Sequence, residues 1–207
     1  MLQGLYVLTD SNLFPHREWP DRIEQCILGG ANIIQLREKK LTDQELLPYA
    51  YIVQEICKHY DVTFIINDRF LLAHKINADG VHIGKSDQPF STVRQYLGSE
   101  FFIGVSCYRN IYKALHLQSI GADYVAFGSV FKSPTKSNAS LCPLSVVFKA
   151  RQTLSIPVCA IGGINADSIR AVSRTGADMY AATHAVFNAA DPQAAANNLC
   201  QQAIMRR

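Results

Sequence analysis

The sequence has no hydrophobic run long enough to cross a membrane and no segment typical of an export signal. Its apolar stretches all fall well short of the roughly 20 residues that span a bilayer. Residues 1–10 are apolar, but they lack the basic start and the long apolar stretch of a signal peptide. We therefore expect a cytoplasmic protein without a membrane partner.

The chain also has little excess charge of either sign. Lysine and arginine number 20, aspartate and glutamate number 17, and the formal net charge is +3. No basic cluster stands out along the chain, although nucleic-acid-binding proteins normally carry one. These features argue against a nucleic-acid partner, whereas the mildly basic balance suits a small anionic substrate.

Cysteine pairs of the Cys-x-x-Cys type are absent. The six cysteines are scattered among apolar neighbours at Cys26, Cys57, Cys107, Cys142, Cys159 and Cys200. Metal sites and disulfide frameworks usually show regular cysteine spacing. We therefore expect buried free thiols in a reducing compartment rather than disulfides or metal ligands.

Apolar residues, in contrast, are abundant. Hydrophobic residues make up 48% and charged residues 18% of the 207 positions. This composition supports a large core and argues against disorder. The length suits one domain, so we expect residues 1–207 to form a single domain.

Eight short apolar runs predict eight β-strands. Runs that are apolar throughout, rather than alternating with polar residues, are typical of strands buried on both faces of a parallel sheet. The predicted strands are Gly4–Leu8, Ala31–Leu36, Thr63–Ile66, Gly80–Ile83, Phe101–Val105, Asp123–Phe127, Ile156–Ile161 and Met179–Ala182.

Amphipathic stretches between these runs predict helices. Apolar residues recur at helical spacing over Trp19–Leu28 and Asp43–His59, and Thr42 is a candidate cap for the second helix. Further helices are predicted near Phe90–Leu97, Ile111–Ile120, Leu144–Thr153, Ala166–Arg174 and Pro192–Met205. Such alternation of strand and helix leaves two architectures, a closed barrel and an open doubly wound sheet.

The segment after the first strand distinguishes these architectures. An open nucleotide-binding sheet normally has a glycine-rich turn there, but this chain has Thr9-Asp10-Ser11-Asn12. In addition, similar turns at Gly29–Asn32, Asn77–Gly80, Gly121–Tyr124 and Gly176–Met179 each precede a strand and indicate repeated units. The sequence therefore predicts an α/β fold with a single (βα)8 TIM barrel.

Strongly polar residues gather at the carboxyl ends of the predicted strands, where barrel enzymes carry their sites. Asp68 and Asp87 follow the third and fourth strands. Two interpretations stay open, because these residues suit helix N-caps and also suit Mg²⁺, which prefers oxygen ligands and retains water or phosphate. The cations Arg37, Lys39 and Lys136 favour a site for Mg²⁺ and a diphosphate.

Gly162-Gly163, after the seventh strand, is a second candidate anion site. The loops after strands seven and eight of a barrel often hold phosphate through backbone amides, although a tight turn alone would also use glycine. Ser133 and Thr135 on the neighbouring loop offer hydroxyl donors. Two anion sites would suit a reaction between two phosphorylated substrates.

Other polar residues are predicted to support the structure. Glu38 would point away from Arg37 and Lys39 if the strand geometry continues. His82 lies within a strand and is more typical of a core or supporting histidine than of a catalytic base. The loop Phe14–Arg17 is expected to cover the first helix or to act as a lid.

Taken in order along the chain, these segments resemble the thiamine phosphate synthase family. The motifs are Gln35-Leu36-Arg37-Glu38-Lys39, Ile66-Asn67-Asp68-Arg69, Ala78-Asp79-Gly80-Val81-His82-Ile83-Gly84 with Asp87, Gly104-Val105-Ser106, Gly121-Ala122-Asp123-Tyr124, Thr135-Lys136, Ala160-Ile161-Gly162-Gly163-Ile164 and Gly176-Ala177-Asp178. They cover almost the whole chain, and their combination is far more specific than any single motif.

The resemblance implies a transferase that uses two small-molecule substrates and Mg²⁺. The diphosphate of 4-amino-5-hydroxymethyl-2-methylpyrimidine would leave, and the nitrogen of hydroxyethylthiazole phosphate would attack the exposed methylene. The products would be thiamine phosphate and pyrophosphate, formed through a pyrimidine carbocation. Fixed cations and Mg²⁺ suit the charge on such a leaving group. A homo-oligomer is compatible with the sequence.

The resemblance also implies roles for individual residues. Catalytic roles fall to Arg37, Lys39, Ser106 and Lys136, and Mg²⁺ binding falls to Asp68 and Asp87. The diphosphate would be held by Arg37, Lys39, Asn67 and Lys136, the pyrimidine by Gln35 and Ser106, and the thiazole phosphate by Ser133, Thr135, Gly163, Thr183 and His184. Leu36, Glu38 and Pro134 complete the predicted substrate-binding set.

Two departures from the family pattern fall in the thiazole half of this site. The chain has Lys132-Ser133-Pro134-Thr135-Lys136 where the family usually has Pro-Thr-x-Thr-Lys, and it has Thr183-His184 where an aliphatic residue and serine are usual. Ser133 keeps the hydroxyl, whereas His184 introduces a larger side chain. The alternatives are therefore a thiazole tautomerase-like isomerase, which would need no diphosphate site, and a non-catalytic phosphate-binding barrel.

Overall fold

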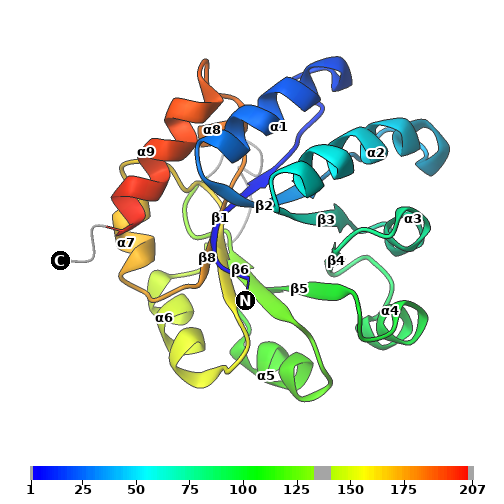
Figure 1. Ribbon diagram of the computed structural model, residues 1–207. Coiled ribbons are helices and arrows are strands. Elements are labelled where there is room, and N and C mark those ends of the chain that lie inside the picture. The colour runs from blue at the N-terminus through cyan, green and yellow to red at the C-terminus, as the bar shows by residue number, and fades with distance from the viewer. Residues whose placement is uncertain (1, 133–140, 205–207) are drawn as a thin grey trace.

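The chain folds into a closed barrel of parallel strands, as predicted. The computed structural model describes residues 2–132 and 141–204. Each strand pairs with the next, and the last pairs with the first to close the barrel. Figure 1 shows the strands at the centre with helices around them. The strands are β1 (Gly4–Leu8), β2 (Ala31–Leu36), β3 (Thr63–Asn67), β4 (Gly80–Ile83), β5 (Phe102–Tyr108), β6 (Tyr124–Gly128), β7 (Val158–Ile161) and β8 (Met179–Ala182).

Helices cover the outside of the barrel (Figure 1). They are η1 (His16–Glu18), α1 (Trp19–Leu28), α2 (Asp43–His59), α3 (Phe70–Ile76), α4 (Phe90–Leu97), α5 (Ile111–Ser119), α6 (Leu144–Thr153), α7 (Ile169–Ser173), α8 (His184–Phe187) and α9 (Pro192–Ile204). Thr42 caps α2, as predicted, because its Oγ1 accepts from the Glu45 amide at 3.3 Å. Across the described residues, no helix combines the length and the apolar composition that a membrane span requires.

Two apolar cores account for strands that are apolar throughout. The smaller core fills the barrel with one face of the strands and includes Tyr6, Ile65 and Met179. The larger core lies between the opposite strand face and the helices, and it includes Trp19 and Phe187. Because both faces of each strand meet a core, polar residues concentrate at the strand ends.

The four repeated turns share one structural role. Each contains a side-chain oxygen that accepts a hydrogen bond from an amide near the start of the previous strand in the chain. The donor and acceptor residues are Leu5 and Asn32 at 3.1 Å, Phe64 and Asp79 at 2.7 Å, Ile103 and Asp123 at 2.7 Å, and Val158 and Asp178 at 2.9 Å. The repeat therefore ties each odd-numbered strand to the even-numbered strand that follows it.

Some element bounds differ from those predicted. Helix α3 was missed because seven residues are too few to show a clear helical period. Strand β5 continues to Tyr108, beyond the predicted end at Val105. Strand β7 begins at Val158 rather than Ile156, since Pro157 has no amide hydrogen to donate to the sheet.

The cysteines are free thiols, as predicted. Five are buried and Cys200 is partly exposed. Burial raises their pKa values, for example that of Cys142 to about 11, so that the thiols keep their protons near neutral pH.

Candidate active site

A cavity of about 620 Å³ opens at the carboxyl ends of the strands, where barrel enzymes bind their substrates. Its lining includes several of the predicted site residues, namely Arg37, Ser106, Gly163, Thr183 and His184. These residues come from both halves of the chain, so the barrel topology gathers them at one mouth.

Asp68 and Asp87 form a carboxyl pair at the ends of β3 and β4. The Asp68 carboxyl lies close enough to Asp87 to raise its pKa, and Lys39 Nζ lies 3.1 Å from Asp68 Oδ2. The Gly84 amide donates to Asp87 Oδ2 at 2.6 Å. Burial raises the pKa of the Asp87 carboxyl, and the Asp68 carboxyl raises it further, against the opposing effects of the Gly84 amide and Lys39. Two carboxyls this close resist ionising together.

This carboxyl pair adjoins the cavity. A methyl group built on Gly84 would lie 3.2 Å from Asp87 Oδ2 and 4.0 Å from the hydroxyl of Tyr108, which lines the cavity. Neither aspartate caps a helix, because Arg69 and Pro89 occupy the N-cap positions of α3 and α4. The helix-cap interpretation is therefore wrong for both residues.

The backbone at Asp68 is strained. Its φ of +64° lies in the left-handed region, which costs a non-glycine residue about 1–3 kcal/mol. The Asp68 amide donates to the His82 carbonyl at 2.8 Å, a bond that holds the backbone of β4 against this turn. Strain of this kind typically persists at functional sites, because surrounding contacts maintain it.

The carboxyl pair fits Mg²⁺. Within residues 2–132 and 141–204, no group of three or more histidine, cysteine or acidic residues is placed to hold a metal. Mg²⁺ is usually held by one or two carboxylates together with phosphate and water. The contact between Asp68 and Asp87 supplies two hard oxygen donors and a like-charge repulsion that a cation would relieve.

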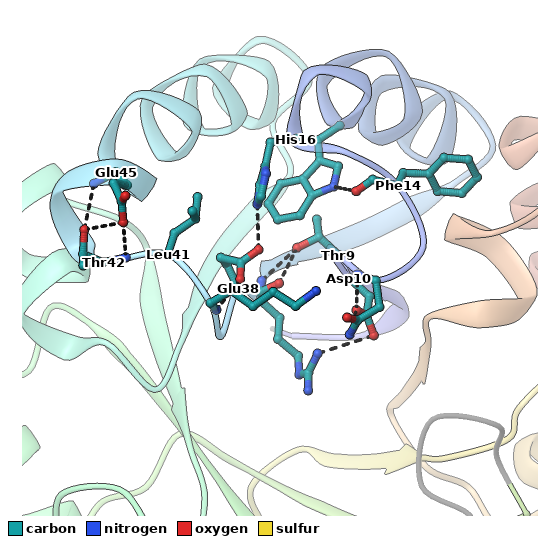
Figure 2. Close-up of polar contacts among 12 residues, drawn as sticks. Thr9, Asp10, Phe14, His16, Glu38, Leu41, Thr42 and Glu45 are labelled. Atoms are coloured by element: carbon teal, nitrogen blue, oxygen red, sulfur yellow. Dashed lines mark hydrogen bonds and ion pairs between the residues drawn. The ribbon is translucent and has the colours of Figure 1, made fainter.

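Thr9 and Asp10, after β1, position Arg37. Thr9 Oγ1 donates to the Arg37 carbonyl at 3.1 Å and accepts from the Arg37 amide at 2.9 Å. The Arg37 guanidinium lies 3.5 Å from the buried Asp10 carboxylate, which also accepts from the Asn12 amide. Figure 2 shows Thr9 and Asp10 beside the loop that carries Glu38. Arg37 is therefore fixed at the cavity wall.

Glu38 points toward His16 and not into the cavity (Figure 2). Its Oε2 lies 2.6 Å from His16 Nε2, and its other oxygen accepts from the Lys40 amide. Burial alone would raise the pKa of this carboxyl, but hydrogen bonds from Ser11, the Lys40 amide and His16 outweigh burial and lower the pKa to about 2. Glu38 thus fastens the β1–α1 loop to the β2–α2 loop, as the structural interpretation predicts.

The side chains of two predicted substrate-binding residues face away from the cavity. The Glu38 carboxylate is committed to His16, and Leu36 is 1% exposed in the larger core between strands and helices. In the sequence motif, both residues lie between Gln35 and Lys39. The strand alternates its side chains between the two cores, so neighbours in sequence face opposite sides.

Gln35, Asn67 and Ser106 lie toward the carboxyl ends of β2, β3 and β5, and of these three only Ser106 lines the cavity. Asn67 ends β3 and is partly buried. Gln35 lies in the barrel interior and donates to the Tyr6 hydroxyl at 2.7 Å. Ser106 lines the cavity, with its Oγ 2.9 Å from His82 Nε2, so His82 has the supporting place that the sequence predicts.

Gly162 and Gly163 require glycine for two reasons. Their φ values are +106° and +64°. A Cβ at Gly162 would lie 2.0 Å from Ser129 Oγ, and one at Gly163 would lie 2.4 Å from the Lys132 carbonyl. The tight-turn interpretation is therefore sufficient for the backbone, while the position of both glycines in the cavity wall keeps the phosphate prediction open.

The chain after β8 forms the cavity rim beside Gly163. Thr183 is the N-cap residue of α8, and His184 is exposed, with Nε2 3.1 Å from Asn188 Nδ2. His184 is therefore held by a neighbour on its own helical turn.

The predicted residues Ser133, Pro134, Thr135 and Lys136 lie outside the described residues. Their roles remain predictions.

Three further residues at this mouth are not among the predicted site residues. Arg109 and Lys132 line the cavity after β5 and β6, where the same strand-end rule would have found them. Arg69 donates to the Leu41 carbonyl at 2.6 Å and the Glu38 carbonyl at 2.9 Å, and so fixes the loop that carries Lys39. No sequence signal distinguishes this role from an ordinary surface ion pair.

The chain is similar in sequence and in structure to proteins that are already known. Residues 5–186 match the family described as thiamine monophosphate synthase. The chain is 42% identical over 198 residues to the thiamine-phosphate synthase of Thioalkalivibrio sulfidiphilus, covering 96% of this chain and 94% of that one. It is 42% identical over 200 residues to the thiamine-phosphate synthase of Methanocella arvoryzae, with the same two coverages, 96% and 94%. The solved thiamine phosphate pyrophosphorylase from Pyrococcus furiosus superposes with a TM-score of 0.89 at 33% identity, covering 97% of this chain and 95% of that one.

Proposed function

Since the chain belongs to the thiamine monophosphate synthase family, we propose that it joins an aminopyrimidine diphosphate to a thiazole phosphate. It is a transferase, like the thiamine-phosphate synthases that it resembles over nearly its full length. The substrates proposed are the diphosphate of 4-amino-5-hydroxymethyl-2-methylpyrimidine and hydroxyethylthiazole phosphate. The products are thiamine phosphate and pyrophosphate.

The observation that carries this proposal is the division of one barrel mouth into two unlike halves. Asp68, Asp87 and Lys39 meet beside the cavity on one side. Across the mouth, Gly162 and Gly163 line the wall in the loop after β7, where barrels often bind phosphate through backbone amides. Two anionic groups of different size would therefore find separate places around one reacting centre.

The proposed reaction exchanges one bond for another. The bond between the pyrimidine methylene carbon and the diphosphate oxygen breaks, and its electron pair leaves with the oxygen. The thiazole nitrogen then donates its lone pair to the methylene carbon. No proton is transferred in this exchange, so the site requires charge stabilisation and positioning rather than a general base.

Residues at different positions around the mouth would bind the diphosphate, hold Mg²⁺ and exclude water. Arg37 and Lys39 would bind the diphosphate, with Asp10 and Asp68 holding their cationic groups in place. Asp68 and Asp87 would hold Mg²⁺, which when bound supplies positive charge to the departing diphosphate. The apolar wall at Leu8, Ala126 and Ile161 would exclude water from the methylene until the thiazole nitrogen attacks.

A pyrophosphate-release assay tests this function. We expect release to require both substrates and to stop when a chelator removes Mg²⁺. Release from the pyrimidine diphosphate alone would indicate a hydrolase instead. No release under any condition, with direct binding of the thiazole phosphate retained, would favour the tautomerase-like or non-catalytic alternatives.

A further inference from the structure

A chain of hydrogen bonds crosses the barrel interior and links Gln35 to Ser106. Gln35 Nε2 donates to the Tyr6 hydroxyl at 2.7 Å, and the two tyrosine hydroxyls of Tyr6 and Tyr124 lie 2.9 Å apart. The Tyr124 hydroxyl lies 3.0 Å from His82 Nδ1, and His82 Nε2 lies 2.9 Å from Ser106 Oγ. Side chains from five strands therefore form one continuous polar path beneath the cavity.

The hydrogen bond from Gln35 to Tyr6 sets the direction in which hydrogens are donated along this path. An amide nitrogen of Gln35 can only donate, so Tyr6 accepts there and must direct its single hydroxyl hydrogen to Tyr124. By the same count, Tyr124 donates to His82 Nδ1. An imidazole that accepts at Nδ1 carries its hydrogen on Nε2, and it donates that hydrogen to Ser106. The Ser106 hydroxyl hydrogen is then left to point toward the cavity.

The other end of the path, at Gln35, has a free acceptor where Ser106 has a free donor. Gln35 is 3% exposed, and its Oε1 has no hydrogen-bond partner within residues 2–132 and 141–204. A buried amide oxygen without a partner is costly, typically about 1–3 kcal/mol. With the nitrogen occupied by Tyr6, the Gln35 side chain retains an unpaired acceptor, while Ser106 at the cavity wall retains a donor.

Burial of the two tyrosines keeps the hydrogen-bonded path uncharged. Tyr6 and Tyr124 are 2% and 0% exposed, and burial raises the pKa of both phenols well above the usual value of 10.0. Each phenol therefore keeps the hydrogen that the path requires at neutral pH.

Gly104 makes the room for this arrangement. A Cβ at position 104 would lie 1.9 Å from Cζ of Tyr124 and 2.4 Å from its hydroxyl oxygen. The Tyr124 ring therefore passes directly over the glycine of β5, two residues before Ser106. The glycine in the Gly104-Val105-Ser106 motif has a specific reason to be there, since any side chain would displace the central hydroxyl of the path.

We propose that Tyr6, Tyr124 and His82 are positioning residues that fix Gln35 as an acceptor and Ser106 as a donor toward the substrate ring. This inference rests on the proposed function. It assigns the site a specificity for heterocycles that carry an amino donor close to a ring-nitrogen acceptor. A 4-aminopyrimidine has this pattern, whereas a 4-oxopyrimidine presents a carbonyl acceptor and an N–H donor in the reverse order.

The ligand test compares two unreactive monophosphates, 4-amino-5-hydroxymethyl-2-methylpyrimidine phosphate and its 4-oxo counterpart, by calorimetric titration. The wild type is expected to prefer the amino compound by about tenfold or more, because the reversed pattern leaves buried groups unpaired. Tyr124→Phe removes one buried oxygen and keeps the ring. It should reduce this preference to within about threefold, since Ser106 and Gln35 lose their imposed polarity.

A second measurement needs no substrate. Nitrogen-15 NMR of the imidazole, assigned with His82→Asn, should find the His82 hydrogen on Nε2 in the wild type. Tyr124→Phe, and independently Tyr6→Phe, should yield a mixture of tautomers. If Tyr124→Phe does not fold, Tyr6→Phe carries both measurements, because it cuts the path at the link that sets its direction.

Tyr180→Phe is the matched control. Tyr180 also lies in a barrel strand, but it is partly buried against the larger core and does not belong to the path. This variant should keep both the ligand preference and the His82 tautomer. The proposal is overturned if wild-type His82 carries its hydrogen on Nδ1, or if Tyr124→Phe keeps the wild-type preference. Wild-type pyrophosphate release is scored separately, so a failure of the proposed reaction would not be mistaken for a failure of this inference.

Discussion

Aspartates stand at both ends of the barrel, but their partners differ. At the amino ends of the strands, Asp79, Asp123 and Asp178 accept from backbone amides at 2.7, 2.7 and 2.9 Å. Asp178 also lies 3.1 Å from an arginine, and Asp123 has a similar arginine partner. At the carboxyl ends, Asp68 and Asp87 face each other.

The difference separates carboxylates that pair with backbone amides and arginines from a pair of carboxyls that lie against each other. An acid that accepts from a strand amide satisfies a donor that the barrel would otherwise leave unpaired. The pair of Asp68 and Asp87 leaves a repulsion that the folded chain relieves only in part through Lys39 and Gly84. Substitution at the carboxyl end should therefore act mainly on activity, and substitution at the amino end mainly on stability.

The largest effect is expected at the carboxyl end. Asp68→Ala and Asp87→Ala should each lower pyrophosphate release by about 100-fold or more, since losing several kcal/mol of charge stabilisation changes a rate by that factor. The melting temperature of Asp68→Ala should stay at or above that of the wild type, because the like-charge contact is removed, whereas that of Asp87→Ala should fall, because the Gly84 amide loses its acceptor. Asp21→Ala, an exposed acid in the first turn of α1, is the control and should change neither quantity. Wild-type rates in both site variants would disprove the metal assignment.

A smaller effect, of the opposite kind, is expected at the amino end. Asp123→Ala should lower the free energy of unfolding by about 1–3 kcal/mol, because the Ile103 amide loses its acceptor. The kcat of the folded fraction should not change. Denaturant unfolding and activity measured on the same sample separate the two quantities. Asp123→Asn retains an acceptor oxygen, so it should cost less than Asp123→Ala. Equal losses would show that charge, and not the amide bond, is what matters at this position.

The smallest effect on stability is expected for Glu38. This residue lies at the carboxyl ends of the strands, but it accepts hydrogen bonds from other residues of the fold, as the aspartates at the amino ends do. Its pKa is lowered to about 2 from an ordinary 4.5, so its ionised form stabilises the fold above pH 4.5. This contribution is lost as the pH falls toward 2. Glu38→Gln should therefore lower the unfolding free energy at pH 7 by on the order of 1 kcal/mol. The difference from the wild type should shrink as the pH is lowered from 4.5. A constant difference across that range would contradict the assigned ionisation.

Much of the barrel could be predicted because both strand faces are buried. The apolar runs give the observed bounds of β1, β2, β4 and β8. The strand-end rule likewise finds Asp68 and Asp87, since the carboxyl ends of parallel strands meet at one mouth. Short helices such as α3 carry too few residues for a helical period to appear.

The finer parts of the site depend on contacts that sequence spacing does not report. Leu36 and Glu38 adjoin site residues in the motif, yet one packs in the core and the other is paired with His16. Tyr6 and Tyr124 meet across 118 positions of the chain, and each taken alone looks like an ordinary apolar strand residue. Only the closed barrel reveals that they share a hydrogen bond.

The side-chain bonds that tie β1 to β2, β3 to β4, β5 to β6 and β7 to β8 also give the molecule a modular construction. In each case the donor and acceptor belong to the same strand–helix–strand segment. A chain divided between α4 and β5 would keep all four of these bonds within one fragment or the other. The barrel therefore consists of four strand–helix–strand units, each held together by its own side-chain hydrogen bond, and α2, α4 and α6 connect these units. We expect the chain to tolerate division or reordering best at these connecting helices.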